Sequence, residues 1–220
     1  MSPIRSLWIL EPITLAFCTL SVAVLVLAYS VPGSTEFLAL SPTLTLEKGY
    51  VWQLLTYALL PYSILSFLIL SGLILWFGRY VERWLGAARY IALLMAAALA
   101  CALTYVVLAP VSVPLVGALF VTSAVGVVFL VWSIANRAVF RWPLKLFWLV
   151  AAAWMLYTAI ASPLYLSIVH LVAWALGGVT AALAIQGWRA MPSNPTPHSD
   201  AREAPGSAGD IAARAGGRER

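Results

Sequence analysis

Long apolar runs dominate the chain, and the polar residues gather between them and at the C-terminus. Six runs approach or exceed the ~20 residues that a helix needs to cross a bilayer core. They cover residues 12–31, 51–77, 90–109, 114–135, 145–161 and 164–187. The runs are continuous rather than alternating, which argues against transmembrane β-strands. The pattern therefore predicts six transmembrane helices.

Composition supports an integral, multi-pass membrane protein, with the lipid bilayer as its surroundings. The 220 residues are 63% hydrophobic and only 10% charged, a balance that soluble domains do not have. The first run is expected to be a retained helix rather than a cleaved signal peptide. Glu11 precedes it, and no small-x-small cleavage site comes before Pro32.

Two features interrupt the apolar pattern in the first half of the chain. Residues 32–50 form the only sizeable external loop, with a short amphipathic piece lying in the membrane interface. Pro61 interrupts the second run, and proline inside a helix removes a hydrogen bond. We expect the backbone of residues 51–60 to enter near the outer face and the main helix to cover residues 61–78. Glu82 would then lie in a solvated cytoplasmic turn with local arginine ion pairs.

The positive charges predict the orientation. Every Lys and Arg except Lys48 lies before the first run, after the second, after the fourth or after the sixth. By the positive-inside rule both termini are cytoplasmic, and we expect a plasma membrane. The net charge of +5 is thus a topology signal rather than a sign of nucleic-acid binding. Residues 189–220 are rich in Pro, Gly, Ser and charge, which predicts a disordered tail after a domain of residues 1–188.

His170 is the only Asp, Glu, Lys, Arg or His in the interior of these runs. Such a group costs a few kcal/mol inside a membrane, so it marks either a function or a paired structural contact. Cys18 and Cys101 are expected to be small buried hydrophobes, without a disulfide. They have no His or Asp neighbours, so neither a metal site nor a cofactor is expected.

Small residues recur every four positions in two of the predicted helices. They are Ala118, Thr122 and Gly126 in the fourth, and Ala173, Gly177 and Ala181 in the sixth. Such smooth faces let membrane helices approach closely, so the fourth and sixth helices are expected to pack together.

Several segments, in order, resemble the rhomboid family of intramembrane serine proteases over roughly residues 49–187. GYVWQLLTYALLPYS resembles the segment that leads into helix two, and GRYVERWLG matches the Gly-x-x-x-Glu-x-x-x-Gly turn. VGALFVTSAVGVVFLVWSIANR resembles helix four, and HLVAWALGG resembles helix six, which starts from the catalytic histidine. The resemblance implies an all-α membrane protein: a six-transmembrane-helix rhomboid-like bundle with the tail attached.

The resemblance implies a serine nucleophile on helix four and a histidine base on helix six, with His and Asn side chains of helix two holding the oxyanion. His170 matches the base. The Gly-x-Ser-Gly motif aligns on residues 117–120, which puts Leu119 at the nucleophile's place, facing the histidine. The oxyanion positions fall on Ser66 and Leu70. If the alignment slips by one residue, they fall on Phe67 and Ser71 instead, and residues 49–86 contain no His or Asn.

Ser123 leaves one catalytic alternative. It follows Leu119 by four residues, so it lies on the same helical face one turn deeper. A Ser123–His170 pair could then act as a rhomboid-type intramembrane serine endopeptidase. Otherwise Ser123 bonds back to the carbonyl of Leu119, and His170 is a structural residue bonded to a backbone carbonyl, Ser123 or Thr122.

These observations leave three functions open. The preferred hypothesis is a pseudoprotease that binds transmembrane helices of other proteins, beside helices two and five, without cleaving them. The active protease with Ser123 and His170 is the alternative. A small transporter is the remote third possibility, because the runs contain one histidine and no acid to line a polar pathway.

Overall fold

The computed structural model describes residues 11–109, 113–135 and 162–189, together with positions 149, 153, 156, 157 and 160. The chain divides into two units, residues 1–186 and residues 187–220. Most of the predicted fifth span, at 145–161, lies outside the described residues. So does the predicted tail beyond residue 189.

The described chain is helical, with one isolated antiparallel bridge between Leu40 and Leu115. Five of its helices are long and apolar enough to cross a membrane, which confirms the all-α membrane fold class. These five are α1 (Pro12–Ser30), α5 (Ile64–Leu85), α6 (Ala87–Leu108), α7 (Ala118–Ala135) and α9 (Leu164–Arg189). The shorter elements are α2 (Ser34–Leu38), α3 (Pro42–Glu47), α4 (Gln53–Thr56) and the 3-10 helix η2 (Tyr57–Leu59).

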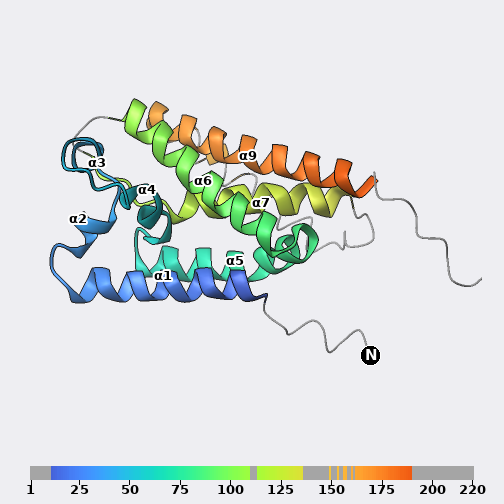
Figure 1. Ribbon diagram of the computed structural model, residues 1–220, viewed down its shortest axis with the longest axis horizontal. Helices are drawn as coiled ribbons and strands as arrows, with labels where there is room; N and C mark the ends of the chain where they lie inside the picture. The colour runs from blue at the N-terminus through green and yellow to red at the C-terminus, as the bar shows by residue number, and fades with distance from the viewer. Residues whose placement is uncertain are drawn as a thin grey trace, which may run out of the picture. The chain divides into compact units, whose positions relative to one another are not determined.

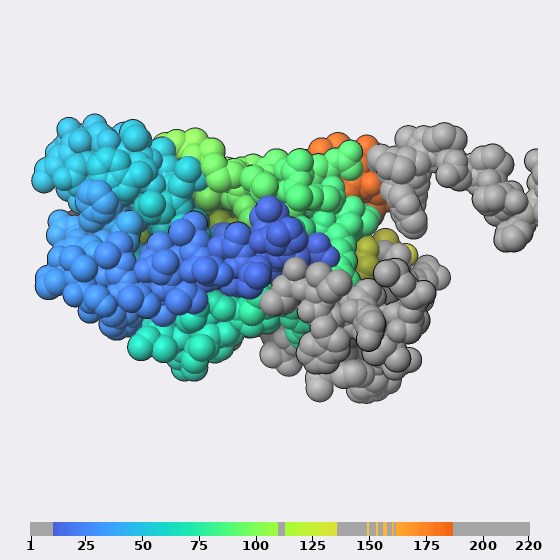
Figure 2. Space-filling model, turned by 60° about the horizontal axis from the view of Figure 1, so that its bottom comes forward, coloured from blue at the N-terminus to red at the C-terminus, as the bar shows by residue number. Residues whose placement is uncertain are grey.

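The long helices form a bundle, and α2, α3 and α4 gather at one of its ends (Figure 1). The helix α5 packs against α1, α6 and α7, and α6 also packs against α7. The start of α1 and the later turns of α9, up to residue 186, lie at the end opposite α2–α4 (Figure 1). Figure 2 shows α1, in dark blue, lying across one face of the bundle with much of its surface uncovered.

The second long helix differs from the sequence expectation at both ends. A single helix over residues 61–78 was expected, but α5 begins at Ile64 and continues past Gly78 to Leu85. Ser63 caps its start in a reciprocal capping box with Ser66, which satisfies two backbone N–H groups. Gly86 ends it with φ +80°, a conformation that glycine adopts without strain. Gly78 therefore lies inside the helix, because local capping residues define its ends.

The expected solvated turn at Glu82 is also wrong, because this side chain is only 3% exposed. Its carboxylate accepts hydrogen bonds from the backbone N–H groups of Ile13 and Thr14, at 3.0 and 2.8 Å. It accepts a third from Thr14 Oγ1 at 2.8 Å. Helix N-termini carry unpaired N–H groups and partial positive charge, so a carboxylate stabilises them. Glu82 of α5 thus caps α1, and beside it Arg83 forms an ion pair with Glu11.

The core lies where α5, α6, α7 and α9 meet, and large apolar side chains on the outer faces of the helices are exposed. Such a surface suits a lipid bilayer, in which the exterior of a helix bundle is apolar. Core members with almost no exposed surface include Ile74, Val81, Ala97, Cys101, Tyr105, Val121, Val125, Phe129, Val169 and Ala173.

Gln53 organises the segment of α2, α3 and α4, and its side chain is fully buried. Its Oε1 accepts from Ser41 N and Thr45 Oγ1, both at 3.1 Å. Its Nε2 donates to the carbonyls of Glu36 and Phe37 at 3.0 and 3.3 Å. A buried amide is favourable only when its donors and acceptors are paired, and here both ends are paired. One side chain therefore holds two short helices onto α4.

Candidate functional site

His170 lies in the second turn of α9 and is 4% exposed. Its Nδ1 lies 2.9 Å from the carbonyl oxygen of Leu166. A carbonyl oxygen can only accept, so Nδ1 carries the proton, and in the neutral ring Nε2 is then an acceptor. Nε2 makes no hydrogen bond with any described residue. The ring is therefore oriented by its own helix.

The side chain that packs on the His170 ring belongs to Phe120, in the first turn of α7. The two ring centroids are 4.5 Å apart, with the planes tilted by 56°. This is the usual separation of an aromatic pair in contact. The ungapped alignment placed Leu119 opposite the histidine. In the structure Leu119 is half-buried, and its neighbour Phe120 covers the ring.

Ser123 is buried on α7, and its hydroxyl donates to the carbonyl of Phe120 at 2.7 Å. The sequence suggested the carbonyl of Leu119, and the structure uses the one three residues back instead. Thr122 likewise donates to the carbonyl of Ala118 at 2.8 Å. Since each hydroxyl has one proton, both protons are used within α7. The structure forms no hydrogen bond between Ser123 and His170.

Gly117, the first glycine of the aligned serine motif, is required by Tyr57. A Cβ at Gly117 would overlap the Tyr57 ring, which is fully buried. Gly117 N donates to the carbonyl of Tyr57 at 2.9 Å, and Tyr57 OH donates to the carbonyl of Ala98 at 2.8 Å. This tyrosine connects η2, α6 and α7. Sequence reasoning missed it, because an apolar run gives no sign of which tyrosine is buried.

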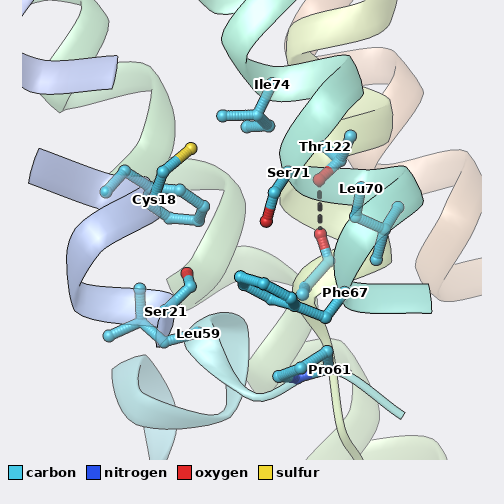
Figure 3. Close-up of a pocket in the computed structure, with 11 residues that line it drawn as sticks. Cys18, Ser21, Leu59, Pro61, Phe67, Leu70, Ser71, Ile74 and Thr122 are labelled. Atoms are coloured by element: carbon cyan, nitrogen blue, oxygen red, sulfur yellow. Dashed lines mark hydrogen bonds between the residues drawn. The ribbon is translucent and has the colours of Figure 1, made fainter. Parts of the chain in front are cut away.

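The positions aligned with the family's oxyanion residues all lie near the start of α5. Ser66 is used in the capping box, where it bonds to Ser63. Leu70, Phe67 and Ser71 line a small pocket that α1 and α7 complete (Figure 3). Neither alignment register therefore places an amide or imidazole donor there.

The expected contact between the fourth and sixth helices is present and centres on Gly177. A Cβ at Gly177 would lie 2.5 Å from the backbone oxygen of Ala124 and 3.0 Å from Cβ of Val127. Gly126, which the spacing also singled out, has no atom within 4 Å of such a Cβ. Cys101 adds a contact between α6 and α9, with its thiol 3.6 Å from the carbonyl oxygen of Val169. These contacts fix the depth of His170 against α7.

No group of three His, Cys, Asp or Glu side chains within the described residues could hold a metal ion. What the described site provides is an acceptor nitrogen on His170 next to an aromatic ring. A serine protease needs a hydroxyl that this nitrogen can deprotonate and donors for the oxyanion.

A comparison with protein families provides a line of evidence beyond the order of the motifs and the helical bundle. The model of the Rhomboid domain matches residues 48–187, which is more than half of the chain. A comparison with curated proteins found no match. The matched range covers α5, α6, α7 and most of α9, together with Leu119, Ser123 and His170. The chain belongs to the rhomboid family.

Proposed function

We propose that this rhomboid-family membrane protein is a pseudoprotease, which binds transmembrane helices of other proteins and does not cleave them. The observation that carries the proposal is the contact of the Phe120 ring with the His170 ring, whose centroids are 4.5 Å apart. A histidine base must lie within hydrogen-bond reach of its nucleophile. Here an aromatic side chain packs on the histidine aligned with the base, and the alignment puts Leu119 at the nucleophile's position.

Two further features support the absence of hydrolysis. The proton of Ser123 is donated to a backbone carbonyl of its own helix, so it is not shared with His170. Residues 49–86 contain no His or Asn to hold an oxyanion from helix two. Removing one oxyanion donor from a serine protease costs about 10²–10³ in rate.

The alternative is an active endopeptidase with Ser123 as nucleophile and His170 as base. Its support is that His170 Nε2 has no partner among the described residues and that Ser123 is buried on the helix against which α9 packs. It requires the Ser123 hydroxyl to leave the carbonyl of Phe120 and the Phe120 ring to move away from the histidine.

For the partner, we place a transmembrane helix along the first half of α5. The large apolar side chains of Ile64, Leu65, Leu68 and Ile69 are all more than half exposed there. In a bilayer this face meets lipid or another helix. The choice of a helix rests on family membership, so it is an argument by analogy.

A pair of photo-crosslinking variants tests the partner. One replaces Leu68 on α5, and the matched control replaces Val107, an equally lipid-facing residue of α6 that is 80% exposed. In native membranes we expect discrete crosslinked membrane proteins at position 68 and none at 107. The captured proteins should keep their full-length mass. Equal crosslinking at both positions contradicts the docking face, and captured partners cut within a transmembrane helix contradict the pseudoprotease.

The proposal includes an orientation with both termini in the cytoplasm of a plasma-membrane protein. The distribution of Lys and Arg supports it, since only Lys48 lies on the other side. Single cysteines introduced at Lys48 and at His198 provide a test with an impermeant thiol reagent. We expect labelling of intact cells at position 48 only, and labelling at position 198 would reverse the orientation.

A further inference from the structure

A small pocket lies between α1, α5 and α7, and its lining includes neither Phe120 nor His170. Its cavity volume is about 10 Å³, close to the smallest space that holds one water molecule. Most of its lining is apolar, including Phe17 and Ile74, but three side chains bring hydroxyl groups to it. These are Ser21 of α1, Ser71 of α5 and Thr122 of α7 (Figure 3).

Ser21 is the member of this set whose hydrogen bonding is incomplete. The residue is 5% exposed, and its hydroxyl makes no hydrogen bond with any described residue. Helical serines and threonines usually donate to a carbonyl three or four residues back. Thr19, two residues earlier on the same helix, does so, with Oγ1 2.9 Å from the carbonyl of Leu15. The Ser21 hydroxyl makes no such bond, and the residue lines the pocket.

The other two hydroxyls can complete a site for water. Thr122 donates its proton to the carbonyl of Ala118, so toward the pocket its oxygen can only accept. The Ser71 hydroxyl can donate or accept, and Figure 3 shows it pointing into the space between α1 and α7. A water molecule has two protons to donate and two lone pairs to accept with. Buried waters typically make two to four hydrogen bonds to protein groups.

We propose that this pocket binds one structural water molecule that joins α1 to the rest of the bundle. The water accepts a hydrogen bond from the Ser21 hydroxyl, donates one to Thr122 Oγ1, and donates to or accepts from the Ser71 hydroxyl. The residues of α1 lie before residues 48–187, which match the Rhomboid domain. The first helix would then be held at two levels, by Glu82 at its N-terminus and by the water at Ser21, further along the helix.

The direct test is an experimental structure of the full chain that resolves ordered waters. We expect a water peak within about 2.7–3.2 Å of Ser21 Oγ and of at least one hydroxyl on α5 or α7. A Ser21 hydroxyl that donates to the carbonyl of residue 17, with no water beside it, would overturn the proposal. So would a lipid or detergent chain in the pocket.

The sign of a stability change provides a second test. If the water is bound, Ser21→Ala removes one of its partners, and the thermal midpoint in detergent should fall by about 2–4 °C. If no water is bound, the same variant removes an unpaired hydroxyl, and the midpoint should stay or rise. Ser71→Ala should lower the midpoint too, and the double variant should fall by less than the sum of both. Thr19→Ala is the matched control on α1, and additive effects or an unchanged Ser21→Ala midpoint would contradict the shared water.

Discussion

The ring centroids of Phe120 and His170 are 4.5 Å apart, on the side of α9 that packs against α7. In rhomboid proteases a histidine of helix six is the base for a serine of helix four, and the sequence alignment matches His170 to that histidine. The Nδ1 atom of His170 donates a hydrogen bond to the carbonyl oxygen of Leu166. Phe120 and Leu166 together make His170 part of the packed interior, which is the basis for a non-catalytic role.

Glu82 should be the main polar anchor of α1. Glu82→Ala leaves two backbone N–H groups and the Thr14 hydroxyl without their acceptor. Each buried group left unpaired costs about 1–3 kcal/mol, so we expect a loss of at least about 2 kcal/mol in unfolding free energy. Chemical denaturation in detergent measures it. Glu47→Gln, at an exposed site, is the control and should change little, and an equally small effect of Glu82→Ala would contradict the capping role.

Gly117, which directly precedes α7, should tolerate no side chain, whereas Gly126 within α7 should accept one. A Cβ at Gly117 would overlap the ring of Tyr57, while one at Gly126 has no atom within 4 Å. Overpacking costs about 1–3 kcal/mol, so Gly117→Ala should lower the thermal midpoint by several degrees. Gly126→Ala should leave it unchanged or raise it. Equal midpoints for the two variants would show that Tyr57 can move aside.

Gly177 and Gly178, which are adjacent on α9, provide a variant and a control for the contact between α7 and α9. A Cβ at Gly177 would lie 2.5 Å from the backbone oxygen of Ala124, but one at Gly178 meets nothing within 4 Å. We expect Gly177→Ala to push the helices apart and to lower stability by about 1–3 kcal/mol. Gly178→Ala should be neutral. A cysteine crosslink between α7 and α9, formed more slowly only in Gly177→Ala, would verify the cause.

Gln53→Glu should loosen α2 and α3 while leaving the long helices in place. The carboxylate loses the two donors that bind the carbonyls of Glu36 and Phe37 and faces those oxygens with negative charge. A buried charge left without a partner is costly. Hydrogen exchange should therefore rise in residues 34–59 and not in α6 or α7. Glu36→Gln, on an exposed side chain, serves as control, and unchanged exchange in Gln53→Glu would contradict the role of the amide.

The spans could be predicted from the sequence because each is a long apolar stretch, and the structure places α1, α6 and α7 within a few residues of the expected bounds. The role of Glu82 could not, because its partners Ile13 and Thr14 lie nearly 70 positions away in the chain. In the sequence alone, an acidic residue between arginines such as Glu82 indicates a solvated turn. Only the fold shows that the start of α1 lies beside it.

The candidate site was predictable to the level of its helices but not of its contacts. Gly177 emerged from the small-residue spacing, and His170 from its charge in an apolar run. The contact of Phe120 with the His170 ring could not be predicted, because one residue turns a helix by about 100° and an alignment gives no rotation angle. The hydroxyl of Ser21 gave no signal at all, since a lone serine in a membrane helix ordinarily bonds to its own backbone.

The most direct test of the pseudoprotease is labelling with a fluorophosphonate, which reacts with activated serine hydroxyls. The wild-type protein, Ser123→Ala and His170→Ala would be compared in membranes, with an active rhomboid protease labelled in parallel. We predict no labelling of any of the three, because Ser123 donates to the carbonyl of Phe120 and the Phe120 ring packs on His170. Labelling of the wild type that disappears in both variants would contradict this prediction and establish a Ser123–His170 protease.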